Sequence, residues 1–344
     1  APPFHRLNRA LLVVRVVVPI DRLERRRADP EEAHGIGQPR AALHRPSDRR
    51  VPERVRRYDS VQLRHRTEIM MAWTELTRTQ HKRKTARYPS DLTAEEWAVI
   101  RPFLPGPSRL GRPRKVDLRK VWDAIQYIAA SGCAWSLLPR DFPPVSTVRY
   151  YFYRWRNDGL LAEINRALVA RARQAAGRKA QPTAGVIDSQ SVKTSENTSL
   201  SGFDAGKRIK GRKRHVIIDT CGNLLACTVH SAGIQDRDGA PGVFARLRRE
   251  APKLRHMFAD GGYAGPKLRD ALVSLGRWTL QIVKRSDTAK GFEVLPRRWV
   301  VERTFAWLGR CRRLARDWEK TIESAEAWLL IAHIRRITRL IAKA

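Results

Sequence analysis

The order of short apolar runs and amphipathic stretches after residue 182 constrains the fold more than any other feature. Runs rich in Val, Ile and Leu, typical of buried strands, alternate there with longer stretches of helical periodicity. We expect strands over Ala184–Asp188, His215–Asp219, Leu224–Val229, Met257–Asp260 and Trp278–Val283, and helices over Ala240–Arg249, Pro266–Leu275, Arg297–Leu314 and Ala325–Ala342. A polar turn joins the second and third strands as a hairpin. The pattern predicts an α/β domain at residues 183–344.

The preceding segment, residues 88–176, shows helical patterns only. Ser90–Glu96 offers a helix cap with acids in the first turn, and a second helix should stop near Ser131–Gly132. After a Pro-rich connector, Ser146 and Thr147 should cap a third helix rich in aromatic and basic residues. The arrangement resembles a helix-turn-helix, so we expect DNA binding. A small helical domain with an aromatic core is the simpler interpretation.

Residues 1–69 differ from the rest in composition. They hold sixteen arginines, no lysine and no sustained period, and Met70 and Met71 stand at their border. We expect this segment to be disordered, or an upstream translation of GC-rich DNA with the working protein starting at Met70 or Met71. A basic nucleic-acid-binding arm is the alternative. Residues 70–87 should be a basic linker, and Arg15 interrupts the apolar run Leu11–Ile20, which argues against a signal peptide.

The charge of the chain indicates its class of partner. Its 344 residues carry 68 Lys and Arg against 34 Asp and Glu, a formal net charge of +34. Such an excess favours a polyanion, and DNA above all, since each neutralised phosphate releases counterions. No apolar run reaches the roughly 18 residues of a membrane span. The four scattered cysteines are expected to be reduced thiols of a cytosolic protein.

Three acids are the candidate chemical centre. Asp188 and Asp260 each close an apolar strand run, and Glu302 lies in a helical run near the end of the chain. Such carboxylates can hold two Mg²⁺ ions, or Mn²⁺, beside a phosphodiester. The simpler interpretations are turn formation by each aspartate and a surface ion pair between Glu302 and Arg298. Asp236 and Asp238 are expected to cap a helix.

Five ordered motifs carry a family resemblance. They are Gly185–Lys193, Phe203–Lys207, Lys210–His215, Ala259–Ala264 and Arg298–Leu308. Together they resemble the DDE transposases of bacterial insertion sequences, and the insertion-sequence-five branch in particular, over residues 88–342. The element order and the resemblance imply a ribonuclease-H-like catalytic domain at 183–344, preceded by a helical DNA-binding domain at 88–176.

The resemblance also implies residue roles. Asp188, Asp260 and Glu302 would be the catalytic, metal-binding triad. The family's glutamate signature has a Tyr and a basic residue where this chain has Leu295 and Gly309, with Arg310 one step later. The residues expected to contact DNA are Arg149, Arg154, Arg156, Lys193, Lys207, Lys210, Arg212, Lys213, Tyr263, Arg298 and Arg310.

The expected activity is DNA transposition in the bacterial cytoplasm, at the nucleoid. The protein would bind terminal inverted repeats, cut the DNA and join the freed 3′-hydroxyl to target DNA, at least as a homodimer. One alternative is a metal-dependent nuclease or junction resolvase on the same fold, which lacks strand transfer. The other is an inactive DNA-binding remnant.

Overall fold

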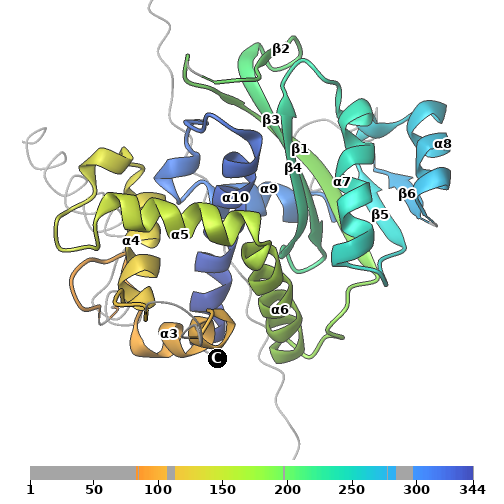
Figure 1. The fold of residues 1–344 in the computed structure, drawn as a ribbon. Coiled ribbons are helices and arrows are strands. Elements are labelled where there is room, and N and C mark those ends of the chain that lie inside the picture. The colour runs from red at the N-terminus through yellow and green to blue at the C-terminus, as the bar shows by residue number, and fades with distance from the viewer. Residues whose placement is uncertain are drawn as a thin grey trace, which may run out of the picture. The chain divides into compact units, whose positions relative to one another are not determined.

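The computed structural model describes residues 83, 85–106, 113–196, 198–276, 278–283 and 297–343 (Figure 1). They belong to the compact unit Glu75–Ala344. The predictions for residues 1–69, for the start at Met70 or Met71, for most of the linker and for Leu295 lie outside the described residues. Within them, no helix is long and apolar enough to cross a membrane. The four cysteines, all described, are free thiols.

A mixed sheet forms the centre of the C-terminal half. Its strands are β1 (Ala184–Lys193), β2 (Gly202–Asp204), β3 (Ile209–Asp219), β4 (Leu224–Ser231), β5 (His256–Ala259) and β6 (Thr279–Ile282). The order is β2-β3-β1-β5-β6, with β4 also paired to β3. The β1–β3 and β3–β4 pairs are antiparallel, whereas β5 runs parallel to β1 and to β6. This topology confirms the predicted ribonuclease-H-like fold.

Three strands, β1, β3 and β4, are longer than the sequence predicted, and β2 was missed. β1 continues five residues past Asp188, and β3 begins at Ile209 instead of His215. The extensions are polar, so no apolar run marks them. They are stable in the sheet because the charged side chains of β3 find partners inside the protein, as described below.

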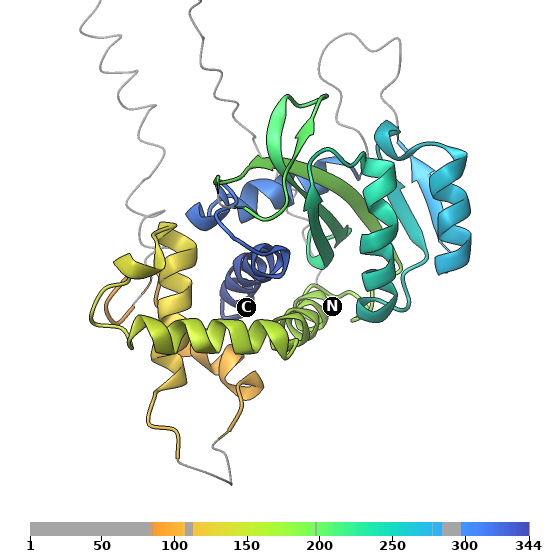
Figure 2. The same ribbon diagram turned by 45° about the horizontal axis from the view of Figure 1, so that its top comes forward.

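The four helices predicted for this half are present, with small shifts of their ends. They are α7 (Asp236–Glu250), α8 (Pro266–Leu275), α9 (Trp299–Leu308) and α10 (Ile322–Ile341). α7 contacts β3 and β4, α9 contacts β1, and α10 contacts β4 (Figure 2). The predicted helix over Arg297–Leu314 is wrong in extent, because α9 ends at Leu308 and a separate 3-10 turn, Arg312–Leu314, follows.

The N-terminal described segment is helical throughout. It comprises α3 (Ala94–Ile100), a 3-10 turn at Arg101–Phe103, α4 (Leu118–Ser131), a 3-10 turn at Trp135–Leu137, α5 (Val145–Asn157) and α6 (Leu160–Ala175). Thr93 and Glu96 form the expected capping box, and Gly132 ends α4 with a φ of +73°. The predicted cap of the third helix is wrong: α5 begins directly after Pro144, with no side-chain cap.

α10 joins the helical segment to the sheet. It contacts α3, α4, α5 and α6 as well as β4, and its Trp328 ring stacks 4.8 Å from Phe152 of α5. The buried apolar side chains of both regions form one continuous core within Glu75–Ala344. A border between a helical and a catalytic domain near residues 177–182 stays a prediction, since the two regions share one core.

Candidate active site

Asp188 and Asp260 are delivered to one place by the parallel pairing of β1 and β5. Val186 pairs with Phe258, and each aspartate follows its paired residue by two positions. Because side chains of a strand alternate faces with a period of two, the carboxylates occupy equivalent positions. Asp188 is not at a strand end, as the sequence predicted, but inside β1 opposite Val216 of β3. It lies at the point where the β5 pairing stops.

Asp188 has the environment of a carboxylate that needs a positive partner. Burial, with a smaller contribution from the nearby charge of Asp260, raises its pKa to about 6, although the Ser189 N–H, Arg298 and Lys207 oppose the shift. The Ser189 N–H donates to Asp188 Oδ1 at 2.7 Å. A bound cation would favour the ionised form, since it replaces the lost hydration of the carboxylate.

Asp260 begins the turn that follows β5. Its Oδ1 accepts the N–H of Gly262 at 2.8 Å, and its Oδ2 lies 3.5 Å from the Arg298 guanidinium. A Cβ on Gly262 would come within 3.1 Å of Asp260 Oδ1 and 3.6 Å of Asp236 Oδ2. Glycine at this position therefore leaves room for two carboxylates side by side.

Glu302 lies on the first turn of α9 and is exposed. Arg298, which contacts Asp260, precedes it by one helical turn, about 6 Å along the axis. Among the described residues, no three His, Cys, Asp or Glu side chains are placed to hold one metal ion. The structure thus brings the two aspartates together and sets Glu302 next to the residue that contacts Asp260. The triad stays a prediction.

A buried polar network supports the aspartates. Asp236, which the sequence presented as a helix cap, is the first residue of α7 after the N-cap Gln235. Its Oδ1 accepts from Ser189 Oγ and Lys213 Nζ, both at 2.8 Å. Burial alone would raise the pKa of Asp236, but these hydrogen bonds lower it. Sequence reasoning missed this network because 47 positions separate Ser189 from Asp236.

Three residues predicted to contact DNA are buried, which corrects their assignment. Arg212 and Tyr263 are 0% exposed and Lys213 is 4% exposed. Arg212 pairs with Asp317 at 3.3 Å. The Tyr263 hydroxyl bonds to His215 at 2.7 Å, and burial raises its pKa well above the ordinary value. None of them can reach a phosphate, since the protein itself satisfies them.

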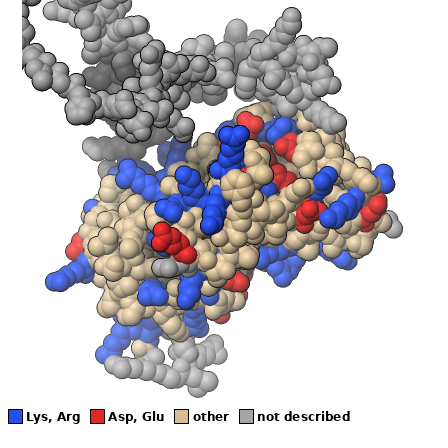
Figure 3. Space-filling view, turned by 90° about the horizontal axis from the view of Figure 1, so that it is seen from above, with Lys and Arg blue, Asp and Glu red and all other residues tan. Residues whose placement is uncertain are grey.

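The other predicted contacts of the sheet region keep their charge at the surface. Lys193, Lys207, Lys210 and Arg310 are exposed, and Arg298 is partly so. Arg298 contacts Asp260, and Lys207 lies close by, with its Nζ 3.2 Å from the carbonyl of Ser189. Lys and Arg side chains lie across the face drawn in Figure 3, with acidic residues between them.

The three arginines of α5 have different surroundings. Arg149 and Arg154 are exposed, whereas Arg156 donates to Ser324 of α10 at 2.7 Å and so holds the two helices together. Arg154 also lines a cavity of about 890 Å³. Its other polar lining side chains come from α5 and from the residues just before α4, and are Ser146, Thr147, Tyr150, Tyr151, Arg114 and Lys115.

Comparisons with known proteins agree with this arrangement. The family described as "Transposase DDE domain" matches residues 179–337, which include all three predicted acids. The family described as "Putative transposase of IS4/5 family" matches residues 92–165, the helical segment.

Two relatives show the same likeness. The "Putative transposase for insertion sequence element IS402" of Burkholderia cepacia is 30% identical over 126 residues, 35% of this chain and 59% of that protein. "Uncharacterized protein y4sN" of Sinorhizobium fredii (strain NBRC 101917 / NGR234) is 33% identical over 81 residues, 24% of this chain and 65% of that protein. The matched part thus spans less than two thirds of either relative.

The two family matches follow one another along the chain without overlap. The match to the DDE domain covers the whole sheet, from β1 to β6, and both of the converging aspartates. The two matches and the likeness to the Burkholderia cepacia relative together support a DDE transposase of the IS4/5 type.

Proposed function

We propose that this protein binds the terminal inverted repeats of an insertion sequence and catalyses metal-dependent cleavage and strand transfer of DNA. The observation that carries the proposal is the placement of Asp188 on β1 and Asp260 directly after β5, each two positions past the paired residues Val186 and Phe258, inside the matched transposase domain. The excess of 68 basic over 34 acidic residues supports a DNA substrate.

The donor set fits a hard divalent cation. Asp188 and Asp260 offer carboxylate oxygens, the ligands that Mg²⁺ prefers, and no soft ligand is needed. The pKa of Asp188, raised to about 6 by burial, indicates a carboxylate whose charge lacks compensation. We assign Asp188, Asp260 and Glu302 to hold two Mg²⁺ ions, for which Mn²⁺ can substitute. Such ions activate the attacking oxygen and stabilise the leaving oxygen of a phosphodiester.

The surrounding side chains position the acids and the DNA. Arg298 orients Asp260, while Ser189 and the Lys213–Asp236 pair hold the strand segment beside Asp188. Lys207 is placed to contact a phosphate near the scissile bond. In the first step water attacks the phosphorus and the 3′-oxygen of the element leaves as a hydroxyl. In the second step that hydroxyl attacks a target phosphodiester, whose own 3′-oxygen leaves.

End recognition is assigned to α5 and the cavity beside it. Ser146, Tyr150 and Arg154 recur at intervals of four residues, so they lie on one side of the helix. Arg149 and the surface residues Lys193, Lys210 and Arg310 would add phosphate contacts. Synapsis of two ends implies a homodimer or larger assembly on DNA. An enzyme that acts on chromosomal elements would work at the nucleoid, in the cytoplasm.

The test is a reaction with DNA that carries the two ends flanking the gene, a plasmid target and Mg²⁺. We expect cleaved and joined products from the unaltered protein, and neither from Asp188→Asn, Asp260→Asn or Glu302→Gln. Asp270→Asn is the matched control, because Asp270 is exposed on α8 and pairs only with its neighbour Arg269 among the ion pairs of the described residues.

The outcomes separate the alternatives. Cleavage without joined product would indicate the nuclease or resolvase. End binding by the unaltered protein with no cleavage under any divalent metal would indicate the inactive remnant. Full activity of Glu302→Gln would remove the glutamate from the triad and leave the aspartate pair.

A further inference from the structure

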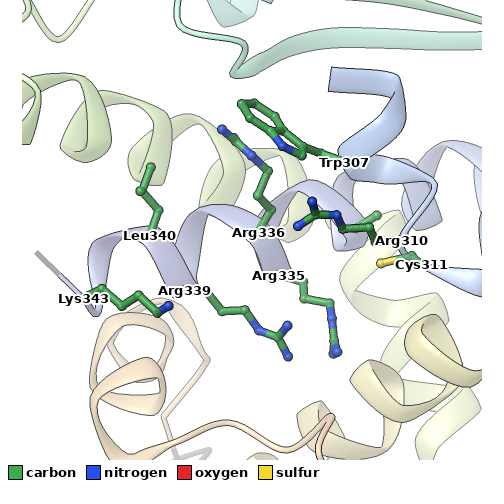
Figure 4. A pocket seen from close by; sticks show the side chains of 9 residues that line it. Trp307, Arg310, Cys311, Arg335, Arg336, Arg339, Leu340 and Lys343 are labelled. Atoms are coloured by element: carbon green, nitrogen blue, oxygen red, sulfur yellow. The ribbon is translucent and has the colours of Figure 1, made fainter. Parts of the chain in front are cut away.

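A second charged site lies between the end of α9 and the last turns of α10. It is a cavity of about 320 Å³, at the lower end of the range of roughly 300–1,000 Å³ typical of small-molecule pockets (Figure 4). One stripe of α10, at spacings of three and four residues, faces it from one side, and Trp307 with the residues after it faces it from the other. Its cationic lining side chains are Arg310, Arg335, Arg336, Arg339 and Lys343.

The charge of this cavity is not balanced by its own lining, which includes no Asp or Glu. Glu96 lies 3.9 Å from Arg339, but it already receives two hydrogen bonds from Arg83. Within the described residues, Arg335 donates its hydrogen bonds to uncharged oxygens, those of Ser90 and Gln126, at 3.3–3.4 Å. The cavity therefore keeps a net positive charge within the described part of the chain.

The cations also act on one another. Burial, together with the nearby charges of Arg303 and Arg310, lowers the pKa of Arg336 to about 10, against the opposing charge of Asp219. Burial and Arg335 do the same for Arg339, whose pKa is also about 10. Both side chains stay protonated at neutral pH, so the cavity holds like charges in a poorly hydrated place. An anion that entered it would relieve desolvation and repulsion together.

The shape of the donors favours phosphate. The planar guanidinium presents paired N–H groups that match two oxygens of a phosphate. Three arginines of α10 line the cavity, with Arg336 extending toward Trp307 and Arg335 and Arg339 extending to the other side of the helix (Figure 4). The Trp307 ring lies 3.7 Å from the Arg336 guanidinium, so this face of the ring is covered and is not open for a base to stack on it. The surroundings therefore suit an oxyanion better than an aromatic ligand.

We propose that this cavity is a phosphate-binding site that holds backbone phosphates of the DNA substrate. The DNA part rests on the proposed function, whereas the anion part rests on the cavity alone. The site would add an anchor on α10 for DNA, separate from the aspartate pair on β1 and β5.

The test removes the two exposed cations of the cavity. The double variant Arg310→Gln/Lys343→Gln should fold, since both side chains are exposed. The matched control is Arg248→Gln/Lys253→Gln, which removes two exposed cations outside the lining. The single variants Arg310→Gln and Lys343→Gln replace the double variant if its thermal unfolding without anion differs from that of the control.

Two measurements are compared. Without DNA, inorganic tripolyphosphate should raise the Tm of the unaltered protein and of the control, with a half-maximal concentration about tenfold higher for the cavity variant. With DNA of the element ends, the slope of log K against log salt should fall in magnitude by about two for the cavity variant relative to the unaltered protein, and it should fall more than for the control.

Loss of both responses supports the proposal, and a cavity variant that matches the control in both overturns it. Loss of the tripolyphosphate response with a slope equal to that of the control shows a site for free phosphate and overturns the DNA assignment. If the unaltered protein responds to tripolyphosphate but does not bind element ends, the proposed function fails while the anion site stands.

Discussion

The acid edge of the sheet, formed by Asp188, Asp260 and Asp236, differs from the basic cavity of α10 in how charge is balanced. At the acid edge, carboxylates alternate with cations of the protein, such as Arg298 on Asp260 and Lys213 on Asp236. In the cavity, cations face cations. The comparison teaches that ion pairs within the protein hold the side chains of the acid edge in place. The cationic side chains of the cavity have no such pairs among its lining residues, so a bound anion would stabilise them.

The largest expected effect tests the acid edge. Asp188→Asn keeps the shape of the side chain but removes its charge, so we expect single-turnover cleavage to fall by roughly 10³-fold or more. Asp270→Asn should leave the rate unchanged. A loss of less than tenfold for Asp188→Asn would show that the acid edge is not the reaction centre and would break the comparison.

The second effect concerns the internal pairs of the acid edge. Lys213 is buried and lies 2.8 Å from Asp236 and 3.5 Å from Asp204. Lys213→Met leaves both carboxylates without their cation, so the free energy of unfolding should fall by about 3 kcal/mol. Urea denaturation measures it, with the exposed Lys253→Met as control. An unchanged midpoint would mean that the pairs do not set the geometry of this edge.

The third effect tests the buried side of α10. His333 is fully buried, and its Nε2 accepts the N–H of Leu224 at 3.1 Å. Burial lowers its pKa to about 3 from 6.5, so the unfolded chain binds the proton more tightly. The contribution of His333 to the free energy of unfolding is therefore fully present above pH 6.5. It is lost as the pH falls from 6.5 toward 3, by about 1.4 kcal/mol per pH unit.

Urea denaturation at pH 6.5, 5.5 and 4.5 checks this slope against the variant His333→Gln. The variant should lose that part of the pH dependence, because glutamine does not titrate. Equal slopes for the two proteins would assign the acid sensitivity to other groups. If the slopes differ as expected, α10 places the neutral His333 in the core and the cationic Arg335, Arg336 and Arg339 at the cavity.

The smallest effect is expected in the cavity. Arg310 is exposed, and its charge lowers the pKa of Arg336. Arg310→Gln relieves this repulsion, so the free energy of unfolding should stay within about 0.5 kcal/mol of that of the unaltered protein. The contrast with Lys213→Met sharpens the comparison. A loss of 2 kcal/mol or more would show that the cavity is structural.

The sequence predicted those parts of the sheet in which the strands are apolar. It also predicted that Asp188 and Asp260, which follow two of these strands, belong to one site. The equal offsets of Asp188 and Asp260 from paired residues follow directly from such a register. The polar part of β3 could not be predicted from the sequence, because Arg212 is stabilised by Asp317, 105 positions later. No local pattern reports such a partner.

The sequence leaves the place of Glu302 and the partners of Asp236 open for a related reason. The placement of Glu302 depends on how α9 is set against the sheet, and that follows from packing over the whole domain. Asp236 has the pattern of a helix-start residue, and only the fold brings Lys213 to it. Side chains whose role comes from a distant segment are those that sequence reasoning assigns least well.

α10 carries a further consequence, since it packs on both the helical segment and the sheet, and Arg156 ties it to α5. If α5 binds the element ends, this junction fixes the distance between the bound bases and the scissile phosphate. Inserting half a helical turn of DNA, about 5 base pairs, between repeat and terminus would rotate the scissile phosphate out of phase with the aspartates. Inserting a full helical turn would restore the rotational position of the scissile phosphate, but the phosphate would lie too far along the DNA to meet the aspartates.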